Sequence, residues 1–146
     1  MFTFANYFKA NMNKIIEKVR NYPFSCVIIV GIWTVCMIPV PETPLDEISF
    51  IDKWTHFVMY GTLTISIWSE YIFRHRKSRS FQWKNLLSWG MICPIIMGGL
   101  VELAQAYLTT YRSGDWFDAL CNSLGVVLGS LIGTLLVRFR ATEDKD

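Results

Sequence analysis

The stretch that decides the fold is FDALCNSLGVVLGSLIGTLLV, residues 117 to 137, an almost unbroken apolar segment near the end of the chain. Its length matches the roughly 20 mainly apolar residues that a helix needs to cross the hydrocarbon core of a bilayer. Gly125, Gly129 and Gly133 recur every four residues, and such a stripe of small residues lets a second helix approach closely. The segment therefore predicts a membrane-spanning helix that packs on a neighbour, either within one bundle or across a dimer.

Three further apolar stretches precede it, at residues 24–40, 54–73 and 86–108. An apolar content of 52%, an aromatic content of 15% and a mean hydropathy of +0.30 are high for a soluble chain of 146 residues. Pro23 and the pair Pro39 and Pro41 bound the first stretch, which shows no small-residue cleavage site, so we read it as an uncleaved anchor. The sequence predicts an all-α polytopic membrane protein with four transmembrane helices.

The segment before the first stretch predicts an amphipathic helix lying on the membrane surface. Apolar residues recur in it at helical spacing, and basic residues are interspersed with them: Phe8, Met12, Ile15, Ile16 and Val19, with Lys9, Lys14, Lys18 and Arg20. A short solvated helix that leads into the first span is the alternative. We expect an interfacial segment at 1–22, a four-helix membrane domain at 23–138 and a charged cytoplasmic tail at 139–146.

Positive charge is distributed unevenly along the chain. All but two of the 14 lysine and arginine residues lie in the N-terminal segment, in the 74–84 connection and in the tail; the exceptions are Lys53 and Arg112. Because positive residues concentrate on the cytoplasmic side, both termini of this multi-pass protein are expected in the cytoplasm. The net charge of +2 gives no support to a nucleic-acid partner.

Polar residues converge on the outer ends of three predicted helices. Members of each helical group lie one turn apart, and a loop adds three more: Asp52, His56 and Tyr60; Glu102 and Gln105; Asp118 and Asn122; and, in the loop, Arg112, Ser113 and Asp115. A charged side chain at the centre of a span costs about 2.5 to 3.5 kcal/mol, so such groups usually face a bundle interior or a cavity. Interhelical ion pairs are the structural alternative, but acids outnumber the bases. The pattern predicts one outward-facing polar site.

Three motifs resemble the VanZ-like family of small bacterial membrane proteins: DKWTHFVMYGTL at 52–63, ELAQ at 102–105 and RSGDWFDALCNSLGVVLG at 112–129. The resemblance covers roughly residues 50 to 135 and leaves out the N-terminal helix and the tail. It implies a place in the bacterial cytoplasmic membrane and a link to low-level teicoplanin resistance. A distant similarity of the family to phosphatidylserine synthases and Wnt proteins implies a site for phosphate-linked lipid head groups. The implied functional set is Asp52, His56, Glu102, Gln105, Arg112, Asp118 and Asn122.

These residues predict an enzyme that hydrolyses or exchanges a phosphate-linked head group of a phospholipid or polyprenyl phosphate at the outer leaflet. His56 would act as base or nucleophile, oriented by Asp52 or Asp118, and Glu102, partly desolvated, would protonate the leaving group. Arg112 would bind phosphate oxygens. The other expected substrate-binding residues are Asn122, Gln105, Tyr60, Ser113 and Asp115.

Two alternatives remain open from the residues alone. Asp52, His56, Glu102 and Asp118 are acceptable ligands for Mg²⁺, Mn²⁺ or Ca²⁺, so a divalent cofactor is an alternative to a metal-free site. The same pocket would also serve a non-catalytic protein that sequesters a lipid-linked cell-wall precursor or masks the surface from lipophilic glycopeptides. The oligomeric state is not specified by the sequence.

Two further expectations concern residues outside this site. Glu70 is expected to pair with Arg74 one turn further along the same helix. Five tryptophans near the span ends are expected to anchor the helices at the membrane interface: Trp54, Trp68, Trp83, Trp89 and Trp116.

Overall fold

The computed structural model describes residues 4–39, 50–75, 82–112 and 114–143 of the chain. In these ranges the protein is almost entirely helical and contains no strand, as the sequence predicts. The elements are α1 (Phe4–Asn21), α2 (Pro23–Met37), α3 (Ile51–Arg74), α4 (Trp83–Leu87), the π-helical turn η2 (Ser88–Ile92), α5 (Cys93–Leu108) and α6 (Trp116–Glu143). Helices α4, η2 and α5 follow one another without a gap, with the π-helical turn directly ahead of Pro94.

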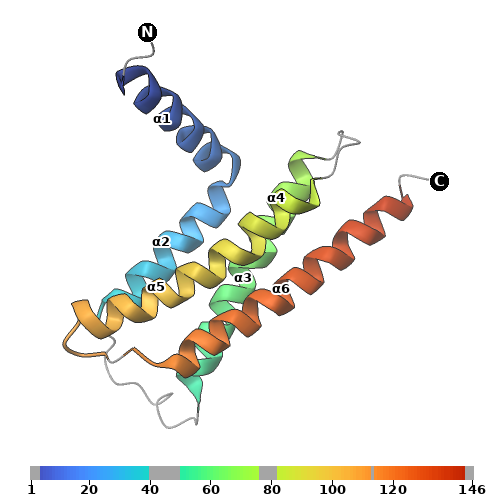
Figure 1. Cartoon of the computed structure of the whole chain (residues 1–146). Coiled ribbons are helices and arrows are strands. Elements are labelled where there is room, and N and C mark those ends of the chain that lie inside the picture. The colour runs from blue at the N-terminus through green and yellow to red at the C-terminus, as the bar shows by residue number, and fades with distance from the viewer. Residues whose placement is uncertain (1–3, 40–49, 76–81, 113, 144–146) are drawn as a thin grey trace.

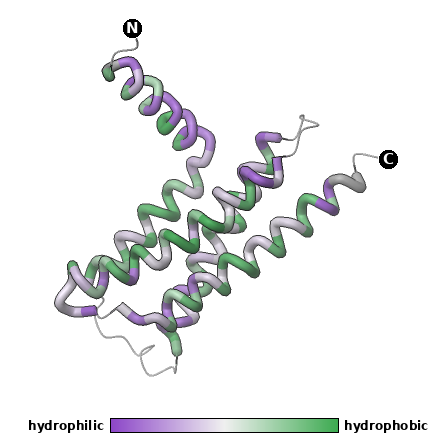
Figure 2. The backbone as a smooth tube through the Cα atoms, viewed as in Figure 1, coloured by the Kyte–Doolittle hydropathy of each residue, from purple (hydrophilic) through white to green (hydrophobic). Residues whose placement is uncertain are grey.

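Helices α2, α3, α5 and α6 form a bundle in which successive helices run in opposite directions (Figure 1). Helix α1 extends away from the bundle at the end where α2 begins. The apolar residues are concentrated along α2, α5 and α6, while polar residues gather in α1 and near both ends of the bundle (Figure 2). The end where α3 and α6 begin and α5 finishes is called the outer end below; the opposite end, where α2 begins and α3 finishes, is called the hinge end.

By length and composition, two helices of the described chain are suited to cross a membrane, Trp83–Leu108 and Trp116–Arg140. A third span results only if Asn6–Asn21 and Pro23–Met37, which are bent by 94° from each other, count as one. Helix α3 is not among them, although its 24 residues are long enough. It carries charged residues near both ends and buried polar residues such as His56 and Thr64 along its length, so its sequence is less apolar than those of the two candidate spans.

The glycine stripe of α6 packs against α3 within the same chain, which confirms the prediction of a close helix contact. A Cβ atom added at Gly129 would lie 2.8 Å from the carbonyl oxygen of Gly61 and 2.8 Å from the Thr64 side chain. Added at Gly125, it would clash with the carbonyl group of Phe57. The absence of side chains along this stripe therefore lets α6 lie directly on the backbone of α3.

Trp68 lies in the interior of the protein, so its predicted role as an interfacial anchor was wrong. It is fully buried and forms a cluster with Tyr71 and Leu86. It packs against the glycine stripe, where a Cβ at Gly133 would run into its ring. The other four tryptophans of that prediction are exposed on the helix surfaces: Trp54, Trp83, Trp89 and Trp116.

Glu70 and Arg74 hold the break between α1 and α2, so the predicted pairing of these two residues was wrong. The Glu70 carboxylate accepts hydrogen bonds from the backbone N–H groups of Phe24 (2.8 Å) and Ser25 (3.2 Å) and from the Ser25 hydroxyl (2.5 Å). Arg74 donates to the carbonyl groups of the last two residues of α1 and to the Asn21 side chain. Each charge satisfies helix-end groups of the opposite polarity, which holds α1 at its angle to the bundle.

Candidate functional site

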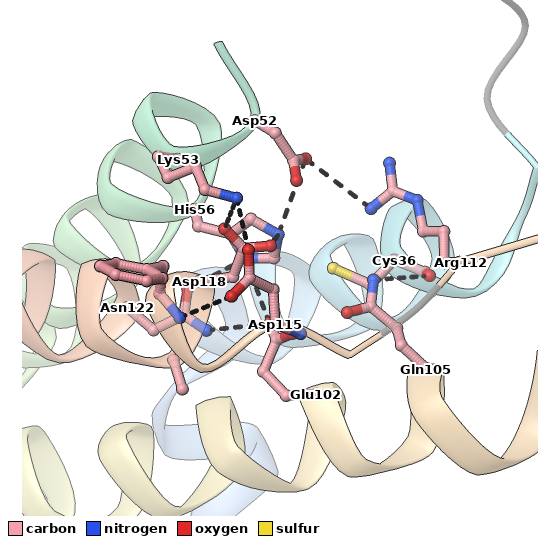
Figure 3. A network of polar contacts seen from close by, with 12 residues as sticks. Cys36, Asp52, Lys53, His56, Glu102, Gln105, Arg112, Asp115, Asp118 and Asn122 are labelled. Carbon is pink, nitrogen blue, oxygen red and sulfur yellow. Dashed lines mark hydrogen bonds and ion pairs between the residues drawn. The ribbon is translucent and has the colours of Figure 1, made fainter. Parts of the chain in front are cut away.

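The predicted polar residues meet at the outer end of the bundle, where the first turns of α3 and α6 face the last turns of α5 (Figure 3). Helix α3 contributes Asp52, Lys53 and His56, α5 contributes Glu102 and Gln105, and α6 with its preceding loop contributes Arg112, Asp115, Asp118 and Asn122. The close contact of α6 with α3 at Gly125 brings Asn122, one turn earlier, next to His56.

His56 occupies the centre of this site, with its side chain 1% exposed. Its Nδ1 lies 3.1 Å from Asn122 Oδ1, and Asn122 Nδ2 lies 3.5 Å from Glu102 Oε1. Since the amide nitrogen faces the carboxylate, the amide oxygen is the group that accepts from the imidazole, and Nδ1 carries the proton. In the neutral ring Nε2 is then the basic nitrogen. It faces Asp52 Oδ1 and Asp118 Oδ2, each at 3.9 Å.

Glu102 lies on the opposite side of the imidazole from Asp52 and Asp118. Its Oε1 is 3.7 Å from His56 Nδ1, and its Oε2 accepts a hydrogen bond of 3.2 Å from the backbone N–H of Asp115. The residue is buried. Glu102 thereby connects α5 to the start of α6 while remaining in contact with the histidine.

Lys53 is a member of the site that is missing from the residues predicted from the sequence. Its Nζ lies 2.8 Å from Asp115 Oδ2 and 2.9 Å from Asp118 Oδ1. Its position next to Asp52, away from the segments that hold all the other basic residues except Arg112, was the available signal. Lys53 joins α3 to both acids at the start of α6.

Asp115 has a structural role at the beginning of α6. Its Oδ1 accepts a hydrogen bond of 2.8 Å from the N–H of Phe117, and its carbonyl accepts from the N–H groups of Asp118 and Ala119, which is the geometry of a helix N-cap. The hydrogen bond from Lys53, and then that from Phe117, lower the pKa of Asp115 below its ordinary value. The residue is therefore ionised at neutral pH.

Arg112 and Asp52 form the rim of the site. The Arg112 guanidinium approaches Asp52 Oδ1 at 4.0 Å, and their side chains are 25% and 49% exposed. In contrast, Glu102, Asp118 and Asn122 are buried. A ligand that reaches the site therefore meets the arginine before it meets the histidine.

Two of the expected substrate-binding residues have other surroundings. Gln105 is buried and donates a hydrogen bond of 3.1 Å from Nε2 to the carbonyl of Cys36, which joins α5 to the end of α2. Tyr60 is fully buried one turn beyond His56, and its hydroxyl has no hydrogen-bond partner among the described residues. Ser113 lies outside the described residues. Gln105 thus contacts the helix beside the site rather than the histidine.

The site carries more acidic than basic groups. Four carboxyl groups lie at this end of the bundle, three of them facing His56, and Lys53 and Arg112 are the basic residues in contact with Asp52, Asp115 and Asp118 in the described chain. With all carboxyl groups ionised and the histidine neutral, an excess of two negative charges remains. Leaving charge uncompensated in a buried site is costly, so this excess favours a cationic partner or bound protons.

A model of the VanZ/LLP1 family matches residues 2–137, and the chain belongs to that family. The match confirms the resemblance, but it begins almost at the first residue, so the expectation that the N-terminal segment lies outside the family pattern was wrong. No curated protein and no solved structure was found to match the chain. The family membership and the apolar helices together indicate a membrane protein.

Proposed function

We propose that the protein is a membrane-embedded enzyme that hydrolyses or exchanges a phosphate-linked head group of a phospholipid or polyprenyl phosphate at the outer leaflet. The observation that carries the proposal is the orientation of His56. Asn122 holds its Nδ1–H, so the basic Nε2 faces the two aspartates on the side where Arg112 forms the rim. A base beside an arginine at the mouth of a buried polar site suits attack on a phosphate ester.

In the proposed chemistry each residue has a role that follows from its place around the imidazole. Arg112 binds two phosphate oxygens and stabilises the charge that develops on them. His56 Nε2 accepts the proton of a water or alcohol whose oxygen attacks phosphorus, and Asp52 and Asp118 stabilise the imidazolium. The bond from phosphorus to the leaving oxygen breaks, and that oxygen takes a proton from Glu102, which carries it in the resting enzyme and so offsets part of the acidic excess. Asn122 keeps the histidine in the required tautomer.

The proposed membrane arrangement has four spans, α2, α3, the continuous α4–α5 helix and α6, with both termini in the cytoplasm. The hinge end carries Arg74, Lys84, Arg138 and Arg140 and lies next to basic α1, which supports a cytoplasmic location for that end. Helix α1 lies on the surface of the cytoplasmic membrane, and exposed apolar residues such as Phe8, Ile15 and Val19 support this placement. Residues 23–138 form the membrane domain and 139–146 the cytoplasmic tail.

The proposal is tested by turnover of defined lipids. The full chain is reconstituted into vesicles containing a panel of phospholipids and polyprenyl phosphates, and head-group release or exchange is followed by mass spectrometry. We expect turnover of one lipid class that is lost in His56→Ala and Glu102→Gln. His75→Ala and Glu17→Gln serve as matched controls, since they remove the other histidine and an exposed acid of α1. Equal turnover in His56→Ala and His75→Ala contradicts the proposal.

The second candidate is a binding protein that sequesters a lipid-linked cell-wall precursor or masks the surface from lipophilic glycopeptides such as teicoplanin. The Lys53 bridge to two aspartates favours it, because ion pairs of this kind can hold a binding site rigid without chemistry. Glu102→Gln separates the two functions. A binder keeps its affinity for the lipid, because the amide preserves size and hydrogen bonding, whereas the enzyme loses turnover. Co-purification of one lipid with no turnover in any variant selects the binder.

A further inference from the structure

We infer that the outer end holds one divalent cation between His56 Nε2 and the carboxylates of Asp52 and Asp118. The inference goes beyond the proposed function, and binding of the ion can be measured without any substrate. A coordinated Nε2 has no free lone pair to accept a proton, so the ion competes with the proposed chemistry and the metal-free chain is the form that turns lipid over. The ligand set differs from the four residues that the sequence suggested, because Glu102 is on the other side of the imidazole.

The distances among the three groups fit a shared ion. One ligand atom from each of Asp52, His56 and Asp118 can be chosen so that all three lie within 4.8 Å of one another. Nε2 is 3.9 Å from an oxygen of each aspartate. Hard cations such as Ca²⁺ bind oxygen at about 2.3 to 2.6 Å, so opposite ligands are separated by about twice that length. A cation of this size fits between the three atoms, and a smaller one requires a side-chain rotation of exposed Asp52.

The orientation of the buried imidazole is the second and independent observation. Nδ1–H is bonded to Asn122, whereas Nε2 makes no hydrogen bond to any described residue and faces an oxygen of each aspartate at 3.9 Å. A nitrogen lone pair of a histidine that is 1% exposed is thus directed at two carboxylates without a hydrogen bond to either. Metal-binding histidines almost always donate their other N–H to a fixed acceptor, and Asn122 is such an acceptor.

The net charge of the site also favours a bound cation. The two negative charges that Lys53 and Arg112 leave uncompensated are balanced by one divalent cation. The ion also resolves the contact between Nε2 and the carboxylates, since a neutral imidazole nitrogen and a carboxylate oxygen both present lone pairs and repel each other. Mixed nitrogen and oxygen ligands suit Mn²⁺, and carboxylates also accept Mg²⁺ and Ca²⁺.

Binding of Mn²⁺ followed by electron paramagnetic resonance tests the inference. The full chain, stripped of metal with a chelator, is placed in phosphatidylcholine nanodiscs, whose zwitterionic head groups give a low background, and titrated with Mn²⁺. We expect one tightly bound Mn²⁺ per chain, seen as loss of the free-ion signal, with a nitrogen coupling from the coordinated imidazole in the pulsed spectrum. Absence of saturable binding, or a bound ion without nitrogen coupling, overturns the inference.

Variants assign the ligands. Asp118→Asn and His56→Gln are expected to weaken Mn²⁺ binding at least about tenfold, while Glu102→Gln, which removes a nearby charge but no ligand, weakens it less than either of them. Glu17→Gln and His75→Ala are the matched controls, and each variant is checked by thermal unfolding. If Asp118→Asn does not fold, Asp52→Asn at the exposed rim replaces it. Equal weakening in Glu102→Gln and Asp118→Asn overturns the ligand set, because it indicates a diffuse acidic surface.

The result is separable from that of the turnover assay. Turnover that persists in chelator, together with absent Mn²⁺ binding, refutes the ion and leaves the enzyme. Mn²⁺ binding with the expected ligands, without turnover of any lipid, supports the ion and refutes the enzyme.

Discussion

The two ends of α3 both carry ionisable residues, but they use them differently. At the hinge end Glu70 and Arg74 bind the N–H groups of α2 and the carbonyl groups of α1. Both charges are thereby matched by the ends of two helices. At the outer end the carboxyl groups around His56 exceed their basic partners, and Nε2 has no hydrogen-bond partner among the described residues.

This difference separates a structural use of charge from a functional one. Charges that stabilise a fold find partners inside the fold, because unpaired buried charge is costly. A site for a charged ligand retains groups whose partner comes from outside. The charged groups at the hinge end therefore have their partners within the protein, whereas the outer end retains a base without a hydrogen-bond partner and an excess of acidic groups. Substitutions at the two ends should have opposite consequences for stability and activity.

The largest effect is expected for His56→Gln at the outer end. Loss of a general base typically lowers turnover about 10² to 10⁴-fold, and the fold should persist because the glutamine amide can still donate to Asn122. The measurement is the rate of head-group release together with the unfolding temperature in nanodiscs. A variant with full turnover, or one that loses turnover only by unfolding, removes the distinction between the two ends.

Glu70→Gln at the hinge end should lower stability and leave turnover unchanged. Hydrogen bonds to a charged group contribute about 1.5 to 3 kcal/mol each, so replacing the carboxylate lowers the unfolding temperature and makes the connection between α1 and α2 accessible to protease. Turnover per folded molecule should be unchanged. Ser66→Ala is the matched control, because among the described residues the Ser66 hydroxyl contacts only the Ser25 hydroxyl at the same joint, at 3.3 Å. Reduced turnover in folded Glu70→Gln would show that the hinge end acts on the site.

The sequence contained most of the site because its residues are spaced by the helix period. Asp52 with His56, and Asp118 with Asn122, share a face whatever the bundle geometry, and the charge distribution placed these faces at one end. The sequence could not specify which side chains contact each other across helices, since these contacts depend on the rotation and depth of each helix. Gln105 is the example: its spacing to Glu102 is correct, yet its amide reaches the carbonyl of Cys36.

The fold was predictable to a similar degree. The apolar stretches identified the helices and the glycine stripe identified a close contact, but not that α3 is the partner. The break between α1 and α2 was marked by Pro23, whereas its angle depends on Glu70 and Arg74, which are more than 40 residues further along the chain. Local spacing had suggested that these two residues pair with each other. Long-range partners at helix ends outweighed the local pair.

Gly125→Ala tests the close contact between α6 and α3 beside His56. A methyl group at this position would collide with the carbonyl of Phe57, next to His56, and overpacking of this kind typically costs about 1 to 3 kcal/mol. We expect a lower unfolding temperature and reduced turnover together, since α6 must move away from α3. Gly99→Ala is the matched control because a Cβ there meets no atom within 4 Å. Equal stability of the two variants would show that α6 tolerates a shift along α3.

The smallest effect is expected at Asp115, the one acid of the outer end that resembles the hinge end in its contacts. It caps α6 and binds Lys53, so both of its oxygens already have partners. Asp115→Asn keeps a side-chain oxygen for the Phe117 N–H and should leave stability nearly unchanged, whereas Asp115→Ala removes the cap and lowers the unfolding temperature modestly. Turnover measured beside unfolding distinguishes the roles. If Asp115→Asn abolishes turnover in a fully folded protein, Asp115 contacts the substrate, and the outer end is functional up to its exposed rim.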